Sequence, residues 1–269
     1  MTQGTLTFIG LGLYDDQDMS LKALNELQTC DLIFSEFYTS TLVGTTLKKL
    51  ESTIGKNIIV LTREETEDAT RILTEAKDKH VCFLTGGDAM IATTHVDIRI
   101  RAIKQGIKTK IIHGTSIVTA APGLLGLQQY KFGRTTTLVI PEERYFPTSP
   151  YDVIKKNKSL GLHTLVLLDI QADKDRFMTA AEGINVLLEM EKRRNEHVIN
   201  DDDIICVICQ AGSDEPTVFA DTFRSLKDKE YGEPLHTLVI PGDLHFVEME
   251  ALQTLAYLPE YIGEKFQKL

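Results

Sequence analysis

The sequence predicts an α/β protein with two lobes, the first built on a mostly parallel sheet and the second on a mixed sheet. In the first half of the chain, short apolar runs alternate with helical patterns, so strands are joined by helical crossovers and run parallel. After His113, strands become more frequent and crossovers fewer, which favours a mixed sheet. We therefore expect an N-terminal lobe over residues 1–113 and a C-terminal lobe over residues 114–269. A cleft between such lobes is a common ligand site.

The elements of the first lobe follow from periodicity and from capping residues. Ser20 is a suitable N-cap for the first helix, and Thr62 or Arg63 for the third. The run Val81–Leu84 is wholly apolar and is expected to be buried on both faces of the sheet. The predicted strands are Thr5–Gly10, Asp31–Glu36, Asn57–Leu61, Val81–Leu84 and Lys108–His113, and the predicted helices are Ser20–Leu27, Leu42–Glu51, Glu64–Asp78 and Ile91–Gln105.

The second lobe contains one long helical pattern and several strand-like runs. A proline-containing polar stretch, Pro141–Pro150, is typical of a loop. The predicted helices are Ser116–Leu125, Tyr151–Lys158, Thr179–Arg194 and His245–Tyr257, and the predicted strands are Thr136–Ile140, Thr164–Asp169, Asp203–Gln210, Pro216–Asp221 and Leu235–Ile240.

Composition excludes several classes of function. The 269 residues include 29 basic and 39 acidic side chains, a net charge of −10 that disfavours a nucleic-acid partner. The basic clusters Lys155–Lys158 and Lys192–Arg194 are more typical of solvated helix faces. No apolar run is long enough to span a bilayer, and Met1–Thr5 lacks the basic region of a leader, so we expect a cytoplasmic protein without a membrane partner.

The cysteines and histidines do not indicate a metal site. Cys206 and Cys209 have the spacing of one of the two ligand pairs of a zinc knuckle, but no second cysteine or histidine pair matches them. Residues three apart in a strand also face opposite sides. All four cysteines are therefore expected to be reduced and buried. His245 and Glu248 are possible metal ligands, but a role at the surface or N-terminus of the last helix is favoured.

A glycine turn follows the first strand, with Gly10 and Gly12 allowing a sharp bend and a close approach of the backbone to a ligand. A dinucleotide fingerprint requires a third glycine where Asp15 stands, and an acidic residue is a poor neighbour for pyrophosphate. The alternative is a tight strand-to-helix turn with no ligand. Asp15 therefore favours a cofactor without pyrophosphate.

Two similar turns follow later strands of the first lobe. Asp88, after Gly86–Gly87, is placed to accept hydrogen bonds from ribose hydroxyls or a ligand ammonium, although it is also a suitable helix N-cap. The turn His113–Ser116 offers small residues and backbone groups, or else only an N-cap at Ser116. Three such turns at strand ends together predict a small-molecule cofactor site. The sequence contains no nucleophile elbow of the pattern Gly-x-Ser-x-Gly, so a Ser-His-Asp triad cannot be inferred from it.

These turns, in this order, resemble the tetrapyrrole-methylase family of S-adenosylmethionine-dependent methyltransferases, and within it the archaeal type of diphthine synthases. The glycine turn and Asp88 are shared across the wider family, whereas the segments SEFYTS, ATTH, FPTS and GLHT are typical of diphthine synthases. The resemblance is carried by Phe8–Asp15 (FIGLGLYD), Ser35–Ser40 (SEFYTS), Gly44–Leu47 (GTTL), Ala92–His95 (ATTH), Tyr130–Gly133 (YKFG), Phe146–Ser149 (FPTS), Tyr151–Ile154 (YDVI), Gly161–Leu165 (GLHTL) and Leu168–Ile170 (LDI).

The resemblance implies a reaction and partners. The methyl group of S-adenosylmethionine would pass to the amino nitrogen of 2-(3-amino-3-carboxypropyl)histidine on translation elongation factor 2, and repeated transfer would give the trimethylammonium group of diphthine. It also implies a homodimer. No catalytic base is apparent from the sequence.

The resemblance further implies which residues contact the cofactor, which would lie between the lobes. The family usually has proline after the aspartate of the second turn, where this chain has Ala89, so the backbone near Met90 and Ile91 is expected to be more flexible. The implied cofactor contacts are Leu13, Asp88, Ile91, Ser116, Ile117, Leu168, Ala211 and His236.

Three alternatives stay open at this stage. Methylation of a tetrapyrrole or of ribosomal RNA is disfavoured by the SEFYTS-type segments, and RNA further by the net charge of −10. A non-catalytic cofactor-binding module is disfavoured by the complete set of polar turns. A dinucleotide-dependent oxidoreductase is the generic interpretation of the pattern Gly10-x-Gly12.

Overall fold

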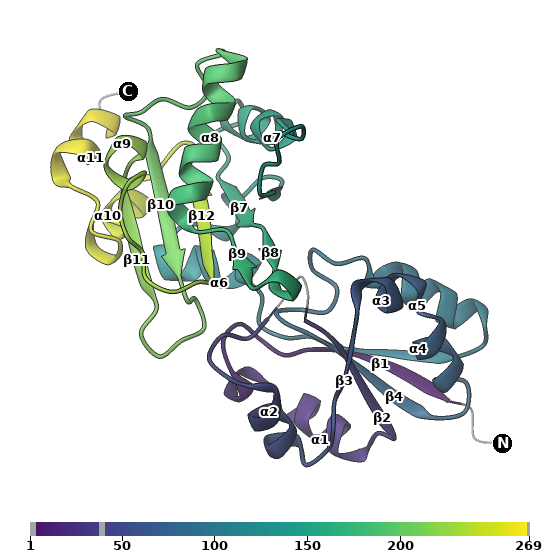
Figure 1. The fold of residues 1–269 in the computed structure, drawn as a ribbon. Coiled ribbons are helices and arrows are strands. Elements are labelled where there is room, and N and C mark those ends of the chain that lie inside the picture. Colours follow the sequence, from purple (N-terminus) through teal and green to yellow (C-terminus); the bar gives the residue numbers. More distant parts are fainter. Residues whose placement is uncertain (1–3, 38–40, 268–269) are drawn as a thin grey trace. The chain divides into compact units, whose positions relative to one another are not determined.

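The computed structural model describes residues 4–37 and 41–267, and Figure 1 shows its helices and strands. The chain forms two compact units, one of Met1–Ile117 with Ile170–Arg176 and the other of Val118–Asp169 with Phe177–Leu269. The lobe boundary predicted between residues 113 and 114 stays a prediction. The last three residues of the SEFYTS segment, 38–40, lie outside the described residues.

The first unit is built on a five-stranded sheet in the order β3-β2-β4-β1-β5. Every pair in it is parallel, as predicted, so the carboxyl ends of all five strands lie at one edge. The central strand β4 is apolar and buried on both faces, which confirms the prediction for Val81–Leu84. The strands are β1 (Thr5–Gly10), β2 (Leu32–Glu36), β3 (Ile59–Leu61), β4 (His80–Thr85) and β5 (Lys108–Ile112).

Helices cover both faces of this sheet (Figure 1). One core contains Ile9 and Ile33 from the strands and Leu27 and Leu50 from α1 and α2. The core on the other face contains aromatic residues of the strands packed with residues of α4 and α5 and with Ala69, which separates α3 from α4. The helices are α1 (Leu21–Thr29), α2 (Leu47–Ile54), α3 (Arg63–Asp68), α4 (Thr70–Glu75) and α5 (His95–Lys104), with a short 3₁₀ helix η1 (Asp16–Asp18) before α1.

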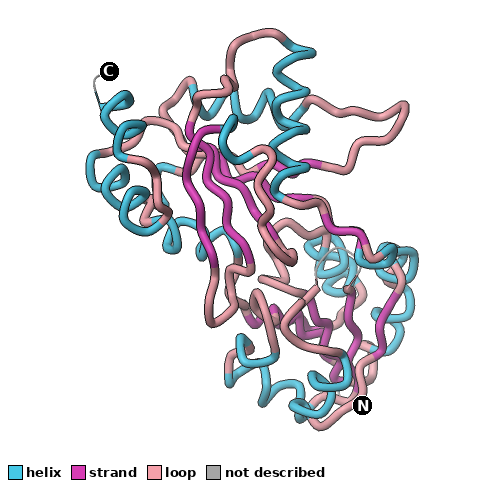
Figure 2. Tube along the Cα trace, turned by 60° about the vertical axis from the view of Figure 1, so that its left-hand side comes forward, coloured by secondary structure: helices cyan, strands magenta, loops and turns pink. Residues whose placement is uncertain are grey.

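The second unit has its own five-stranded sheet, in the order β11-β10-β12-β7-β6. The β6–β7 pair is parallel and the other three pairs are antiparallel, which confirms the predicted mixed sheet. Figure 2 shows the strands of each unit gathered into a sheet and flanked by helices. The strands are β6 (Thr136–Leu138), β7 (Thr164–Leu168), β10 (Ile204–Cys209), β11 (Thr217–Thr222) and β12 (His236–Ile240).

The helices of this half of the chain include four that were predicted close to their observed positions, α6, α7, α8 and α10, and two short ones that were not predicted, α9 and α11. The helices are α6 (Ile117–Leu125), α7 (Ser149–Lys158), α8 (Ala180–Arg194), α9 (Phe223–Leu226), α10 (Phe246–Leu255) and α11 (Glu260–Gln267), with 3₁₀ helices η2 (Gln129–Lys131) and η3 (Ala172–Lys174) and a small ladder of β8 (Ile170–Gln171) with β9 (Arg176–Phe177).

Three predicted helices of the first unit differ from the observed ones, either in where they begin or in whether they are continuous. The helix predicted at Leu42–Glu51 begins only at Leu47, because the Thr46 side chain caps it by accepting a hydrogen bond from the Lys49 amide. The helix predicted over residues 64–78 is divided at Ala69, whose φ of 55° is left-handed. The helix predicted from Ile91 begins at His95, so Asp88 is not its N-cap.

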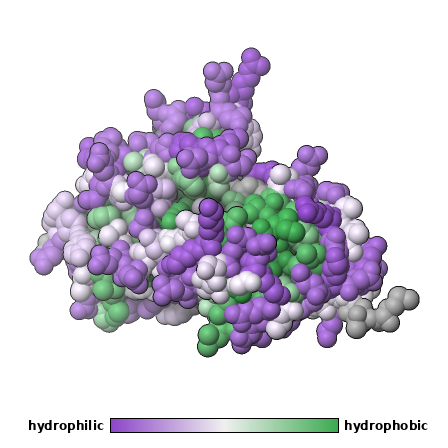
Figure 3. Space-filling model, turned by 60° about the horizontal axis from the view of Figure 1, so that its bottom comes forward, coloured by the Kyte–Doolittle hydropathy of each residue, from purple (hydrophilic) through white to green (hydrophobic). Residues whose placement is uncertain are grey.

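Other predicted caps are confirmed. The Ser20 hydroxyl accepts a hydrogen bond from the Ala23 amide at 3.1 Å, and Thr62 forms a capping box with Glu65. The four cysteines are unpaired and buried, also as predicted. The face of the molecule shown in Figure 3 is largely hydrophilic, in keeping with the acidic net charge, and apolar residues gather in a few places on it.

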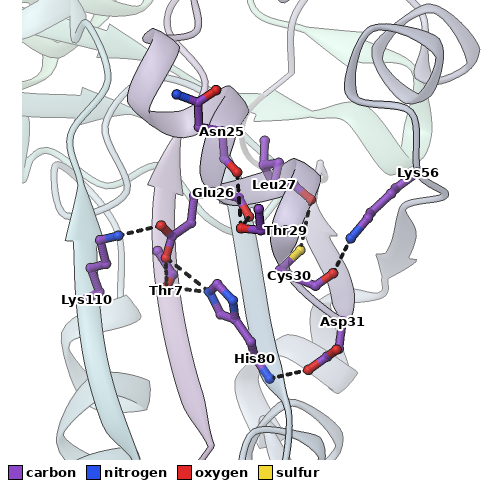
Figure 4. Close-up of polar contacts among 10 residues, drawn as sticks. All are labelled: Thr7, Asn25, Glu26, Leu27, Thr29, Cys30, Asp31, Lys56, His80 and Lys110. Carbon is purple, nitrogen blue, oxygen red and sulfur yellow. Dashed lines mark hydrogen bonds and ion pairs between the residues drawn. The ribbon is translucent and has the colours of Figure 1, made fainter.

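A polar cluster fixes α1 to the sheet of the first unit (Figure 4). The Glu26 carboxylate accepts hydrogen bonds from Thr7 at 3.0 Å and from Lys110, and it lies 3.0 Å from Nε2 of His80. Burial raises the pKa of Glu26, but these partners outweigh burial and lower it. Asp31, just after α1, accepts a hydrogen bond from the His80 amide at 2.7 Å.

The second unit contains a more deeply buried cluster around Glu248 on α10. Its carboxylate accepts hydrogen bonds from the amides of Gln128 and His245, from Lys131 Nζ at 2.5 Å and from His163 Nε2 at 3.0 Å. His163 Nδ1 accepts from the Gly242 amide, which fixes the ring with its proton on Nε2. Glu248 and His245 also form a capping box, which confirms the predicted role at the helix N-terminus.

This cluster predicts an acid-sensitive contribution to stability. Burial raises the pKa of Glu248, but the hydrogen bonds from its four partners outweigh burial and lower the pKa to about 2. A carboxylate with a depressed folded-state pKa stabilises the protein above its unfolded-state pKa, and that contribution is lost as pH falls towards the folded value.

We expect the free energy of unfolding to fall by roughly 2 kcal/mol more between pH 6 and pH 3 in the parent protein than in Glu248→Gln. The measurement is urea unfolding followed by circular dichroism at both pH values. Identical pH dependence in the two proteins would show that the Glu248 carboxylate is not the group that titrates.

Candidate cofactor site

Three glycine turns meet at the carboxyl edge of the first sheet. A side-chain carbon on Gly10 would lie 2.5 Å from the Gly87 carbonyl oxygen and 2.7 Å from the Gly114 nitrogen. One on Gly114 would collide with the same oxygen. The Leu11 amide donates to the Thr85 carbonyl at 2.9 Å and joins the ends of β1 and β4. Only glycine fits at Gly10 and Gly114, so the three turns form a floor of backbone atoms without side chains.

The turn after β1 uses its own amides internally. The Asp18 carboxylate accepts hydrogen bonds from the Leu13 amide at 2.9 Å and from the Tyr14 amide at 2.7 Å. Asp15 caps η1 by accepting from the Gln17 amide at 2.8 Å. A pyrophosphate site needs backbone amides that point at the ligand, and these two already bind a carboxylate. Leu13 is therefore left to contact a ligand through its side chain or carbonyl.

Asp88 lies where the turns after β4 and β5 meet, and it is 6% exposed. One carboxylate oxygen accepts a hydrogen bond from the Met90 amide at 2.8 Å, and the other lies 2.7 Å from Nδ1 of His113. A carboxylate oxygen has two lone pairs, so each oxygen keeps one for a ligand donor. The sequence interpretation missed both Asp18 and His113 as site residues, although each stands within or just after one of the glycine turns.

The remaining residues predicted in this unit lie beside Asp88 in the chain or in the next turn. Ile91 is 43% exposed and its amide donates to the Asp88 carbonyl at 3.2 Å. Ser116 is buried after β5, and Ile117 is the first residue of α6. The five predicted contacts Leu13, Asp88, Ile91, Ser116 and Ile117 thus follow the carboxyl ends of the neighbouring strands β1, β4 and β5.

The second unit gathers the other three predicted residues at one edge of its own sheet. Leu168 ends β7, Ala211 follows β10, and His236 begins β12. Both β7 and β10 run antiparallel to β12, and the register pairs Cys209 with His236 and Leu167 with Thr237. The carboxyl ends of β7 and β10 therefore lie beside the amino end of β12, at the same edge of the sheet.

The ring of His236 is already engaged within the protein. Its Nδ1 accepts a hydrogen bond from the Ala180 amide at 3.1 Å, and its Nε2 donates to the Glu233 carbonyl at 3.0 Å. Burial lowers the pKa of His236, in agreement with a neutral ring that has one accepting nitrogen. A ligand contact by His236 would therefore use the ring face or the backbone.

Within residues 4–37 and 41–267, no cluster of three or more histidine, cysteine or acidic side chains is arranged to hold a metal ion. In the same part of the chain, no helix has the length and apolar character needed to cross a bilayer.

A family model and the sequences of known relatives place this chain in the same protein family. A family model described as Tetrapyrrole (Corrin/Porphyrin) Methylases matches residues 5–227. A diphthine synthase of Methanosphaera stadtmanae is 50% identical over 261 residues, which are 97% of this chain and 99% of the relative. The chain belongs to the diphthine synthase family of tetrapyrrole methylases. A diphthine synthase of Methanococcus maripaludis strain C5 is 52% identical over 251 residues, 93% of this chain and 98% of that relative.

Solved structures of this family have the same fold. The crystal structure of a diphthine synthase superimposes with a TM-score of 0.88 at 36% identity and covers 97% of this chain and 99% of that one. The resemblance predicted from the turns and the SEFYTS-type segments is thereby confirmed, as is the two-sheet α/β fold. Membership of this family makes the protein an S-adenosylmethionine-dependent methyltransferase.

The close contact of the three glycine turns predicts that the effect of a glycine-to-alanine substitution on stability depends strongly on its position. Gly114→Ala should lower the free energy of unfolding by roughly 1–3 kcal/mol or more, because its new methyl group would overlap the Gly87 carbonyl. Gly123, in α6, has no atom within 4 Å of a built side-chain carbon, so Gly123→Ala should raise stability by about 0.5–1 kcal/mol. Chemical denaturation measures both, and equal effects would contradict the close contact.

Proposed function

We propose that this methyltransferase transfers methyl groups from S-adenosylmethionine to the amino nitrogen of 2-(3-amino-3-carboxypropyl)histidine on translation elongation factor 2. Repeated transfer gives the trimethylammonium group of diphthine in diphthamide biosynthesis. The main support is the identity of 50–52% to diphthine synthases over 93–97% of this chain. The segments typical of this family run through both halves of the sequence.

We propose that the residues gathered at each sheet edge contact the methyl donor. This donor has no pyrophosphate, which agrees with the internal use of the Leu13 and Tyr14 amides by Asp18. Asp88 is the central polar residue, because its buried carboxylate can accept hydrogen bonds from ribose hydroxyls or from the methionine ammonium. Leu13, Ile91 and Ile117 would supply apolar contacts around it. The other proposed contacts are Ser116, Leu168, Ala211 and His236.

The chemistry makes modest demands on the protein. The lone pair of a neutral amine forms a bond to the sulfonium methyl carbon while the carbon–sulfur bond breaks, leaving a neutral thioether. The amine itself is the nucleophile, so most of the rate enhancement is expected from alignment and exclusion of water. After each of the first two transfers the nitrogen must lose a proton before it can attack again.

We also propose that the enzyme acts in the cytoplasm as a homodimer, without a nucleic-acid or membrane partner. The cytoplasmic location is supported by the proposed substrate, which belongs to the translation machinery. Exposed apolar side chains on α10, at Phe246, Val247 and Leu255, offer surface that a second copy would cover. The net charge of −10 disfavours a nucleic-acid partner.

The assay that tests the proposal uses radiolabelled S-adenosylmethionine and elongation factor 2 that carries the 3-amino-3-carboxypropyl group on its histidine. We expect label on the factor in a base-stable, nitrogen-bound form, with up to three methyl groups per histidine by mass spectrometry. The matched control is the same factor with an unmodified histidine, which lacks the amine and should take up no label. An enzyme that binds S-adenosylhomocysteine yet leaves the modified factor unlabelled would refute the proposal.

A further inference from the structure

The carbonyl oxygen of Ala89, the residue after Asp88, accepts two side-chain hydrogen bonds. Thr93 donates from Oγ1 and His95 from Nδ1, each at 2.9 Å. Ala89 is fully buried and the bond from His95 is buried with it, so water does not compete for that contact. Both donors belong to the ATTH segment, Ala92–His95, whose first residue has a left-handed φ of 56°. This bend ends in the first turn of α5 and brings both donors to one acceptor.

The ring of His95 is held in a fixed orientation. A carbonyl oxygen can only accept, so Nδ1 carries the proton in this contact, and Nε2 lies 3.6 Å from Oε1 of Glu36. Both side chains are 2% exposed. The ring also packs edge-on against Phe83 at 4.8 Å between centroids and stacks near Phe8 at 6.4 Å. Glu36 ends β2, Phe83 lies in β4 and Phe8 in β1, so side chains from three adjacent strands meet at this ring, which α5 carries.

A rigid peptide plane connects this carbonyl to Asp88. The Ala89 carbonyl and the Met90 amide belong to the same peptide unit, which is planar. The Met90 amide donates to Oδ1 of Asp88 at 2.8 Å. Whatever fixes the Ala89 carbonyl therefore also fixes the direction of the amide that holds the Asp88 carboxylate.

We propose that Thr93 and His95, with Glu36 behind the ring, are positioning residues that orient the Asp88 carboxylate for the methyl donor. The proposal rests on the role given to Asp88 above. It also explains how a turn with alanine at position 89, where the resemblance implies that proline is usual, is held in place. Proline would restrict the backbone by fixing φ at this position, whereas here two side chains hold the Ala89 carbonyl.

Two substitutions at His95 separate the contacts of its two nitrogens. Asparagine places its amide nitrogen as many bonds from the backbone as Nδ1, whereas glutamine reaches as far as Nε2. Both are made together with Glu36→Gln, so that the two variants have the same uncharged side chain at position 36 and differ only at position 95. We expect the dissociation constant of S-adenosylhomocysteine, measured by calorimetry, to rise less than threefold in H95N/E36Q and at least tenfold in H95Q/E36Q, on the scale of a charge-assisted hydrogen bond.

Thr93 gives a second pair that tests the same carbonyl. Thr93→Ser keeps the hydroxyl and should keep the affinity, whereas the nearly isosteric Thr93→Val removes the donor and should weaken binding several-fold. Leu50→Ala is the control for lost stability. This buried α2 residue belongs to the other core of the first unit, in which residues 86–95 take no part among the described residues, so the substitution should lower the melting temperature without changing the affinity.

Asp88→Ala separates failure of the positioning proposal from failure of the site. Lost affinity in Asp88→Ala, with H95N/E36Q and H95Q/E36Q equal to each other and Thr93→Val equal to Thr93→Ser, would overturn the positioning role alone. Unchanged affinity in Asp88→Ala would overturn the role of Asp88, and the positioning role with it. Affinity changes that follow melting temperature, including in Leu50→Ala, would show that these residues act only through stability.

Discussion

The contact between the backbones of Gly10, Gly87 and Gly114 is the constraint on which the rest of the site depends. Adjacent parallel strands lie about 4.8 Å apart, so turns that leave neighbouring strands at the same edge compete for the same space. Two glycines solve this problem by removing the side chains that would collide. The result is an edge where backbone is accessible and where flanking side chains, above all Asp88, are brought together at fixed positions.

Two acidic residues of these turns, Asp18 and Asp88, have opposite consequences for ligand binding. Asp18 turns inward and binds the Leu13 and Tyr14 amides, which removes the donors that a phosphate would require. Asp88 is held from behind by the Met90 amide and from one side by His113, and it keeps acceptor capacity for a ligand. This edge of the sheet is thus better suited to a ligand with hydroxyl or ammonium donors than to a pyrophosphate.

The sequence was sufficient for features that depend on short-range pattern, such as the parallel sheet, the mixed sheet and the caps at Ser20 and Thr62. It was insufficient where distant partners decide the outcome. Asp88 looked like a helix N-cap because the residues after it are helix-compatible, but Thr93 and His95 bend the chain back to Ala89 first. His113 and Glu36 gain their importance only once β5 and β2 take their places in the sheet.

The central claim is that the glycine floor and Asp88 bind the methyl donor, and hydrogen exchange measured by mass spectrometry with and without S-adenosylhomocysteine tests it most directly. Exchange should slow at residues 10–14, 86–91 and 113–117 of the first unit and at residues 166–169, 209–212 and 235–237 of the second. Peptides at the opposite edge of the first sheet, such as residues 77–81, should not change. Slowing confined to that opposite edge, with residues 86–91 unaffected, would contradict the account.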